Sequence, residues 1–246
     1  MTFDLLIGRL KALANPDNVA GMARYGIGTA GCLGVPMPVL RQMAKEIGRS
    51  HDLADRLWRS GIHEARILAG LIDDPQRVTD EQMERWAVDI DSWDICDQLC
   101  SNLFSRTRFA YEKAAAWSCR PETFVKRAGF VLMAALAVHD RKADDAAFAS
   151  FLPRIAHESG DDRNFVKKAA NWALRQIGKR NPALNLLAVE TAREIAETGS
   201  RSARWIAADA LRELTDEKSW YRWQKNRRKE KPAVSSPTGT ADRKDT

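Results

Sequence analysis

The apolar residues of this 246-residue chain recur every three or four positions through most of its length, which is the spacing of one buried face of an α-helix. No segment of the sequence shows the apolar–polar alternation of a half-buried strand, so the pattern predicts an all-α protein. The pattern breaks at turn-forming residues near Asn15-Pro16, 26–38, 73–75, 140–144, 160–162, Asn181-Pro182 and Gly199-Ser200. These breaks leave helices of ordinary length.

Two short motifs mark where helices are expected to begin. Thr79 is followed three residues later by Gln82, the spacing of a capping box, and Pro121-Glu122 places a proline and an acid in a predicted first turn. A third motif is rejected: GIGTAG, residues 26–31, matches the dinucleotide-binding pattern, but a helical segment precedes it where that pattern requires a buried strand. We therefore expect a flexible interhelical loop there.

Several predicted helices begin alike, with cations next to a small apolar run: Lys126-Arg127-Ala128, Lys167-Lys168-Ala169 and Arg201-Ser202-Ala203-Arg204, with Glu64-Ala65-Arg66 as a looser relative. Arg127 and Lys168 are 41 residues apart, and Lys168 and Arg204 are 36 apart. These separations approach the period of about 40 to 47 residues of paired-helix solenoids. Cations at one place in each pair would form a basic stripe on the concave side, suited to a phosphate backbone. The alternative is that they are solvated helix starts with a few salt bridges.

The net charge of +6 is concentrated at one end of the chain. Residues 225–246 contain seven basic and three acidic residues and hold +4, which leaves +2 for the rest. We expect residues 1–224 to form a single helical-repeat domain and residues 225–246 to be a basic, disordered tail. Overall basicity is therefore weak evidence for a nucleic-acid partner unless the charge of the body is sorted onto one face.

Composition also limits the class of protein. The longest apolar run, Ala128 to Val138, is much shorter than the roughly 20 residues of a membrane-spanning helix, and the N-terminus is typical of an amphipathic helix rather than a signal peptide. We expect a cytoplasmic protein without a membrane segment. The cysteines at 32, 96, 100 and 119 fit neither a disulfide framework nor the ligand spacing of a zinc site. We expect them to be small core residues, with no metal bound.

The stretch SWDICDQLC, residues 92–100, carries the candidate chemistry. On a helical wheel Trp93 and its neighbours form a broad apolar arc, and Asp97 stands at the border of that arc beside Trp93. That position fits a carboxylate in the wall of a cleft. A second interpretation makes Asp97 a half-buried partner of Arg127 or another repeat cation and leaves Trp93 in the core. Trp172 is open to the same two interpretations.

From about residue 14 to residue 214 the chain resembles the AlkD-type DNA glycosylases of the DNA alkylation repair family, which are built from HEAT-like repeats. The resemblance rests on five stretches in the family's order: ARYGIGTAGCLGVPMPVLR (23–41), HEARILAGLI (63–72), SWDICD (92–97), FVKRAGFVLMA (124–134) and FVKKAANWALRQIGKRNP (165–182). It implies an all-α, HEAT-like solenoid with a basic concave cleft.

The resemblance also implies roles for particular residues. The residues it places at the reaction are Asp97, Trp93 and Trp172. Of the residues expected to contact DNA, Tyr25 and Arg127 follow from the resemblance. Lys126, Lys168, Arg175 and Arg204 are further cations of the chain that we expect to contact DNA. The chain departs from the family in having Ser92-Trp93 where relatives often have two tryptophans, and in a glycine-rich loop at 26–34. Both departures bear on substrate preference.

The activity implied is that of a monofunctional glycosylase. Such an enzyme excises 7-methylguanine and 3-methyladenine from duplex DNA by hydrolysing the N-glycosidic bond, without a cofactor and without flipping the base into a deep pocket. The expected partner is double-stranded DNA with cationic alkylated bases, bound by a monomer. Two alternatives stay open: a non-catalytic DNA-binding protein of the same family, and a helical-repeat scaffold for proteins.

Overall fold

The computed structural model describes residues 2–216, which contain fourteen α-helices, one short 3₁₀ helix and no strand. The helices are α1 (Phe3–Ala12), α2 (Pro16–Ala23), α3 (Met37–Ile47), α4 (His51–Arg59), α5 (His63–Ile72), α6 (Asp80–Asp89), α7 (Trp93–Asn102), η1 (Phe104–Arg106), α8 (Ala110–Trp117), α9 (Thr123–His139), α10 (Asp145–Ala149), α11 (Leu152–Glu158), α12 (Asn164–Gly178), α13 (Pro182–Glu197) and α14 (Arg201–Leu214). The all-α prediction is confirmed. The predicted tail, 225–246, lies outside the described residues.

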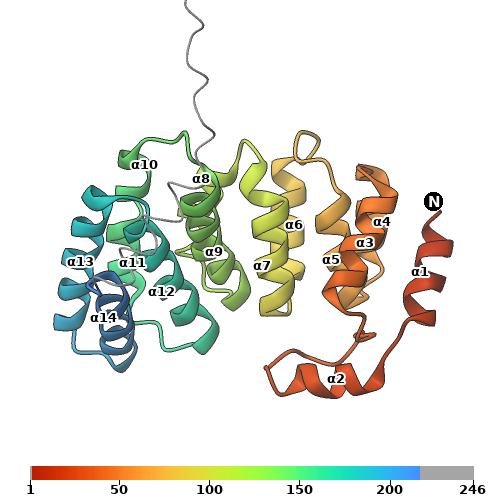
Figure 1. The fold of residues 1–246 in the computed structure, drawn as a ribbon, viewed down its shortest axis with the longest axis horizontal. Coiled ribbons are helices and arrows are strands. Elements are labelled where there is room, and N and C mark those ends of the chain that lie inside the picture. Colours follow the sequence, from red (N-terminus) through yellow and green to blue (C-terminus); the bar gives the residue numbers. More distant parts are fainter. Residues whose placement is uncertain (1, 217–246) are drawn as a thin grey trace, which may run out of the picture.

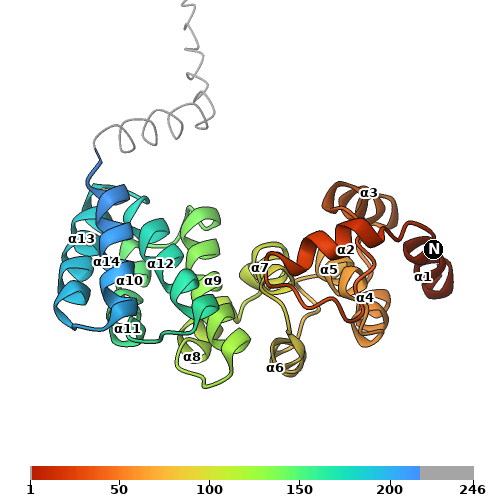
Figure 2. The same cartoon turned by 90° about the horizontal axis from the view of Figure 1, so that it is seen from below.

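The helices stack side by side from α1 at one end to α13 and α14 at the other (Figures 1 and 2). One row, here called the inner row, consists of α5, α7, α9, α12 and α14, each packed on the next. A second helix covers most of these: α4 packs on α5, α8 on α9, α11 on α12 and α13 on α14. This is the HEAT-like repeat solenoid that the sequence predicts. Glu64, Arg127, Lys168 and Arg204 all lie near the beginning of an inner-row helix, so they share one position in the repeat.

The helix start predicted at Thr79 is present, and helices also begin at three of the predicted breaks. Asn15, Thr79, Asn181 and Ser200 are N-caps whose side chains accept hydrogen bonds from the first turn. Gln82 does not complete a capping box, because its side-chain amide donates to Asp73 at 2.7 Å. The prediction for Pro121-Glu122 was wrong by two residues: α9 begins at Thr123 with Glu122 as its N-cap.

The core is continuous along the stack. α9 lies at its centre, and every residue from 125 to 137 is buried. Gly129 lets this helix approach the end of α8, because a Cβ there would lie 2.4 Å from the backbone nitrogen of Ser118. The cysteines only partly match the expectation of core positions. Cys96 and Cys100 are buried, whereas Cys32 is half-buried and Cys119 is exposed. No helix among residues 2–216 is long and apolar enough to cross a membrane.

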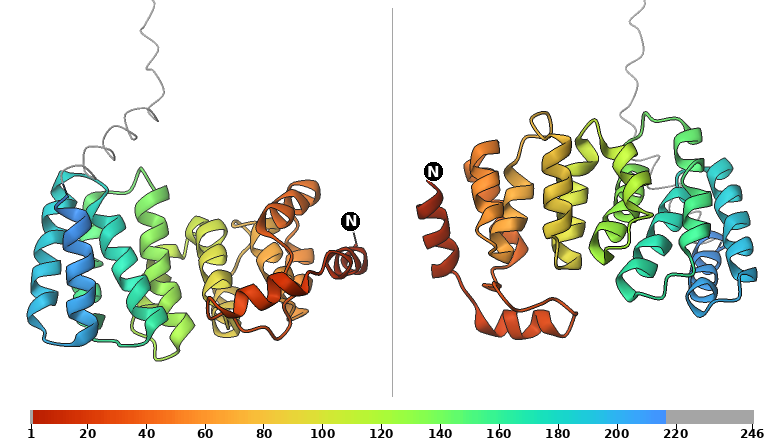
Figure 3. Two further views of the ribbon diagram at one scale, coloured as in Figure 1. Left: turned by 60° about the horizontal axis from the view of Figure 1, so that its bottom comes forward. Right: turned by 180° about the vertical axis from the view of Figure 1, so that it is seen from behind.

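Helix α2 and the loop that follows it depart from the repeat. They lie at one edge of the stack, crosswise to the neighbouring helices (Figures 1 and 3). The buried carboxylate of Glu64 anchors the loop by accepting hydrogen bonds from the backbone N–H groups of Leu33 at 2.8 Å and Gly34 at 2.6 Å. Gly34 has a φ of 75°, and a Cβ there would lie 2.3 Å from the carbonyl oxygen of Asn15. GIGTAG belongs to this loop and not to a strand–helix turn, as predicted.

Candidate active-site cleft

A cleft of about 850 Å³ opens between α2 with its loop and three inner-row helices, α5, α7 and α12. Most of its wall is apolar, with Met22, Ile27, Met37 and Ile67 among the contributors. The polar groups come mainly from one side of α7. Because residues three and four apart share a helix face, α7 presents Trp93, Asp94, Asp97, Gln98 and Ser101 to the same space.

The cleft brings together four residues that lie far apart in the sequence. Asp97 and Trp93 come from α7, Trp172 from α12 and Tyr25 from the loop after α2. The indole N–H of Trp93 donates to the backbone carbonyl of Tyr25 at 3.0 Å, so it holds the loop against α7. The Tyr25 side chain itself is 74% exposed. Trp93 and Trp172 are thus half-buried cleft residues and not part of the closed core.

Asp97 is both a cleft residue and the partner of a buried cation. Arg127 donates to the Asp97 carboxylate from Nε at 3.1 Å and from Nη2 at 2.9 Å to each oxygen, and from Nη1 to the carbonyl of Phe165 at 2.7 Å. The Arg127 side chain is only 7% exposed, against 19% for Asp97. Asp97 therefore both lines the cleft and pairs with Arg127, whereas Trp93 is not the core residue that the second interpretation requires. Burial raises the pKa of Asp97, and the charge of Arg127 offsets only part of that rise.

A second buried pair lies beside Asp97 and was not recognised from the sequence. His63, at the start of α5, is 2.8 Å from Asp94 through Nε2, and Ser92 donates to the other oxygen of Asp94. Burial lowers the pKa of His63, but Asp94 outweighs it and the pKa lies above its usual value. For Asp94, burial raises the pKa, and the contact with His63 reverses the shift. The charge of Asp94 in turn contributes to the raised pKa of Asp97.

The cations expected on the concave face of the solenoid do not line this particular cleft in the described part of the chain. Among residues 2–216, those that line the cleft include Asp17, Glu64, Asp94 and Asp97 but no lysine or arginine. The repeat cations are distributed in three ways. Arg127 lies behind Asp97, Lys126 and Arg175 pair with acids elsewhere, and Lys168 and Arg204 are exposed. Among the described residues, any lysine or arginine that meets a ligand of this cleft therefore lies outside its lining.

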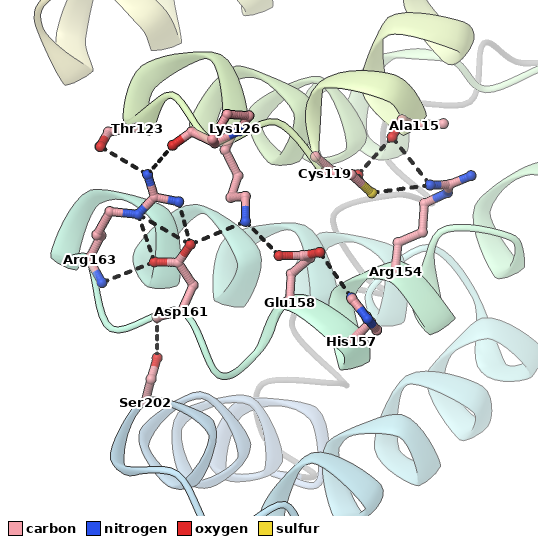
Figure 4. Close-up of polar contacts among 12 residues, drawn as sticks. Ala115, Cys119, Thr123, Lys126, Arg154, His157, Glu158, Asp161, Arg163 and Ser202 are labelled. Atoms are coloured by element: carbon pink, nitrogen blue, oxygen red, sulfur yellow. Dashed lines mark hydrogen bonds and ion pairs between the residues drawn. The ribbon is translucent and has the colours of Figure 1, made fainter.

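Lys126 illustrates why the prediction of a free cation fails. Its ammonium group lies 2.6 Å from Glu158 and 3.3 Å from Asp161, and the residue is 8% exposed (Figure 4). Arg163 joins the same cluster through Asp161 and donates to the carbonyl of Pro121 at 2.5 Å. These contacts tie α9 to α11 and α12. Lys126 therefore has a structural role, with its charge paired inside the protein.

Arg175 likewise joins helices. Its guanidinium lies 2.6 Å from Glu213 and 3.5 Å from Asp209, both on α14, with 29% of the side chain exposed. Arg204 is exposed and donates to the carbonyl of Gly199 at 2.5 Å. Lys168 is exposed and stands four residues before Trp172, on the same side of α12. Of the predicted DNA-binding cations that are exposed, Lys168 is therefore the one nearest in sequence to a cleft residue.

Comparison with known proteins identifies the kind of molecule in which this cleft occurs. The sequence profile of the family "DNA alkylation repair enzyme" matches residues 6–214. This chain belongs to that family. The matched range includes α2 to α14 and most of α1, so the alkylation repair fold accounts for nearly the whole described chain. A comparison with curated protein sequences gives no significant match.

A solved structure has the same fold as this alkylation repair family member. It is described as "a new family of proteins related to the HEAT-like repeat DNA glycosylases with affinity for branched DNA structures". The two superpose with a TM-score of 0.72 at 20% sequence identity, over 86% of this chain and 95% of the other. At that identity the similarity establishes the fold. In residues 2–216 of the alkylation repair protein, no group of His, Cys, Asp and Glu side chains is arranged to hold a metal ion.

Proposed function

We propose that this protein is a DNA glycosylase that hydrolyses the N-glycosidic bond of cationic alkylated purines, such as 7-methylguanine and 3-methyladenine, in duplex DNA. The observation that carries the proposal is the position of Asp97. It lines an open cleft together with Trp93 and Trp172, and Arg127 fixes its orientation through three hydrogen bonds. A carboxylate held between aromatic rings is suited to a reaction in which positive charge develops.

The chemistry of the lesion explains why this arrangement is sufficient. Alkylation at N3 or N7 makes the purine cationic, so the base leaves as a neutral group and needs little acid catalysis. As the bond stretches, positive charge moves onto the deoxyribose, as in glycoside hydrolysis. Asp97 would stabilise that charge and orient the attacking water. The faces of Trp93 and Trp172 would add cation–π attraction of about 0.5 to 2 kcal/mol each.

The acidic lining of the cleft is compatible with this role. A space with carboxylates and no lysine or arginine favours the cationic base and sugar over the phosphates. The phosphates would then lie outside the cleft, where Lys168 is exposed one helical turn from Trp172. Because the charge of the base already weakens the bond, the proposal does not require the base to enter a deep pocket.

The direct test is release of methylated purines from methylated duplex DNA, measured by chromatography of the free bases. We expect release by the wild type and a decrease on the order of a hundredfold or more for Asp97→Asn, which removes the negative charge but keeps an oxygen that can accept from Arg127. Asp52→Asn makes the same chemical change on α4 at an exposed residue and is the matched control. No release, or equal release by Asp97→Asn, rejects the proposal.

A second function is favoured by one observation. Both carboxylate oxygens of Asp97 accept from Arg127, so the ion pair engages the group that would otherwise act on the sugar. In a protein that only binds DNA, this pair would be purely structural. Binding of methylated duplex without release of base, by both the wild type and Asp97→Asn, would establish that alternative.

A further inference from the structure

An exposed tryptophan on the last inner-row helix has no role in the cleft. Three of the described tryptophans, Trp58, Trp86 and Trp117, are at most 1% exposed and pack in the core, whereas Trp205 on α14 is 40% exposed. The ammonium group of Lys167, on α12, lies 5.3 Å from the centre of its ring. Trp205 is therefore an indole at the surface that is already in contact with a cation.

Further cations lie on the same two helices, α12 and α14. Arg201 and Arg204 lie in the first turn of α14, and Lys168 follows Lys167 on α12; all three are exposed. Neither Lys167, Lys168 nor Arg201 forms an ion pair with an acid of the described chain, in contrast to Lys126 and Arg175. We call Trp205 with these four cations the Trp205 patch. It combines an aromatic surface with a local excess of positive charge.

The fold fixes the position of the Trp205 patch relative to the cleft. α12 and α14 lie side by side, joined by hydrogen bonds from Asn171 to Asp209 at 2.6 Å and from Arg175 to Glu213 at 2.6 Å (Figure 2). At the start of α14, Ser202 donates to the carbonyl of Asp161 at 2.7 Å, which ties that end to the ion-pair cluster around Lys126 (Figure 4).

The patch also adjoins the cleft through α12. Lys168 belongs to the patch and stands one helical turn before Trp172, which lines the cleft. A DNA strand that passes Trp172 can therefore continue over Lys168 towards Trp205. The two surfaces are close enough along α12 to contact one DNA molecule.

We propose that the Trp205 patch binds an unpaired stretch of DNA, with one base stacked on Trp205 and the flanking phosphates on Lys167, Lys168, Arg201 and Arg204. Bases within a duplex are stacked on each other and cannot cover the indole, so this surface fits a single-stranded arm. The inference rests on the proposed function in taking DNA as the substrate. It narrows that substrate to DNA in which a duplex in the cleft is joined to a single-stranded arm.

The experiment compares two unmethylated DNA ligands: a blunt duplex, and the same duplex with a single-stranded arm that carries 2-aminopurine. Affinity is measured by fluorescence anisotropy, and stacking by quenching of the 2-aminopurine. We expect the wild type to prefer the armed duplex. Trp205→Ala should lose about tenfold in affinity for the armed duplex, together with the quenching, and keep its affinity for the blunt duplex. Trp205→Phe should retain most of both.

The controls separate stacking from loss of structure. Leu186→Ala removes a side chain that is 72% exposed on α13 and should bind both ligands like the wild type. The proposal is overturned if the wild type shows no preference for the armed duplex. It is also overturned if Trp205→Ala changes neither ligand or weakens both equally, or if Trp205→Phe binds no better than Trp205→Ala.

These measurements do not depend on catalysis. Asp97→Asn should keep the preference for the armed duplex even though its release of methylated bases is strongly decreased. Failure to release methylpurines would therefore reject the proposed glycosylase activity and not the proposed role of the Trp205 patch. Absence of the preference for the armed duplex in an active enzyme would reject only the role of the patch.

Discussion

Arg127→Met tests whether Arg127 is a structural partner of Asp97 or a ligand for DNA phosphate. The substitution keeps a long unbranched side chain and removes all four hydrogen bonds of the guanidinium, three to Asp97 and one to Phe165. Removing one partner of a buried ion pair costs about 3 to 5 kcal/mol, because the other charge stays buried. Asp97 is 19% exposed to the cleft and can be partly rehydrated, so we expect about 3 kcal/mol at pH 7.

Urea unfolding followed by circular dichroism measures this cost. With a slope of about 3 kcal/mol/M, the midpoint should fall by about 1 M. The loss should depend on pH. Burial raises the pKa of Asp97, and without Arg127 nothing offsets that rise, so the unpaired carboxylate takes up a proton as the pH falls. The destabilisation is therefore largest at neutral pH and shrinks towards acid pH.

The double variant Asp97→Asn/Arg127→Met provides the control, because it also removes the buried negative charge that Arg127→Met leaves without a partner. It should recover a large part of the lost stability. The reasoning is refuted if Arg127→Met unfolds at the wild-type urea concentration, if its loss of stability is the same at pH 5 and pH 7, or if the double variant is no more stable than Arg127→Met. Loss of DNA affinity at unchanged stability would instead assign Arg127 to a phosphate.

Three further predictions follow from other contacts. His63→Gln should destabilise the protein most at mildly acid pH. Because the pKa of His63 is raised in the folded protein, its stabilising contact with Asp94 contributes fully below about pH 6.5, and that contribution is lost as the pH rises through the raised pKa. Urea midpoints at pH 5 and pH 8 measure this, and a larger loss at pH 8 contradicts it. Gly129→Ala should lower the free energy of unfolding by at least about 1 to 3 kcal/mol, because the new Cβ would collide with the backbone of Ser118. Gly160→Ala is the control, because its new Cβ has open space around it and should leave the free energy of unfolding unchanged. Lys168→Ala should weaken DNA binding, lower the slope of log affinity against log salt by about 0.9 and leave the melting temperature unchanged; an unaltered slope would remove this residue from the DNA interface.

Local interactions explain how much of the fold could be predicted. Helix periodicity, the cap at Thr79 and the breaks near Asn15, Asn181 and Ser200 depend on residues a few positions apart, and the structure has helices that begin at each of these positions. The shared helix face of Trp93 and Asp97 is equally local, because residues four apart on a helix are neighbours wherever the helix lies. The sequence therefore determined the all-α repeat architecture and the residues that α7 could present to a cleft.

Contacts between repeats could not be determined in this way. Lys126, Lys168 and Arg175 look alike in the sequence, but the tertiary structure pairs Lys126 with Glu158 and Arg175 with Glu213, and leaves Lys168 exposed. The same applies to Arg127, whose partner Asp97 lies 30 residues earlier. Helical spacing tells which side of its own helix a charge occupies. The packing of the next helix decides which acidic residue pairs with a given cation. This packing depends on side chains throughout the core, so helical spacing alone does not predict it.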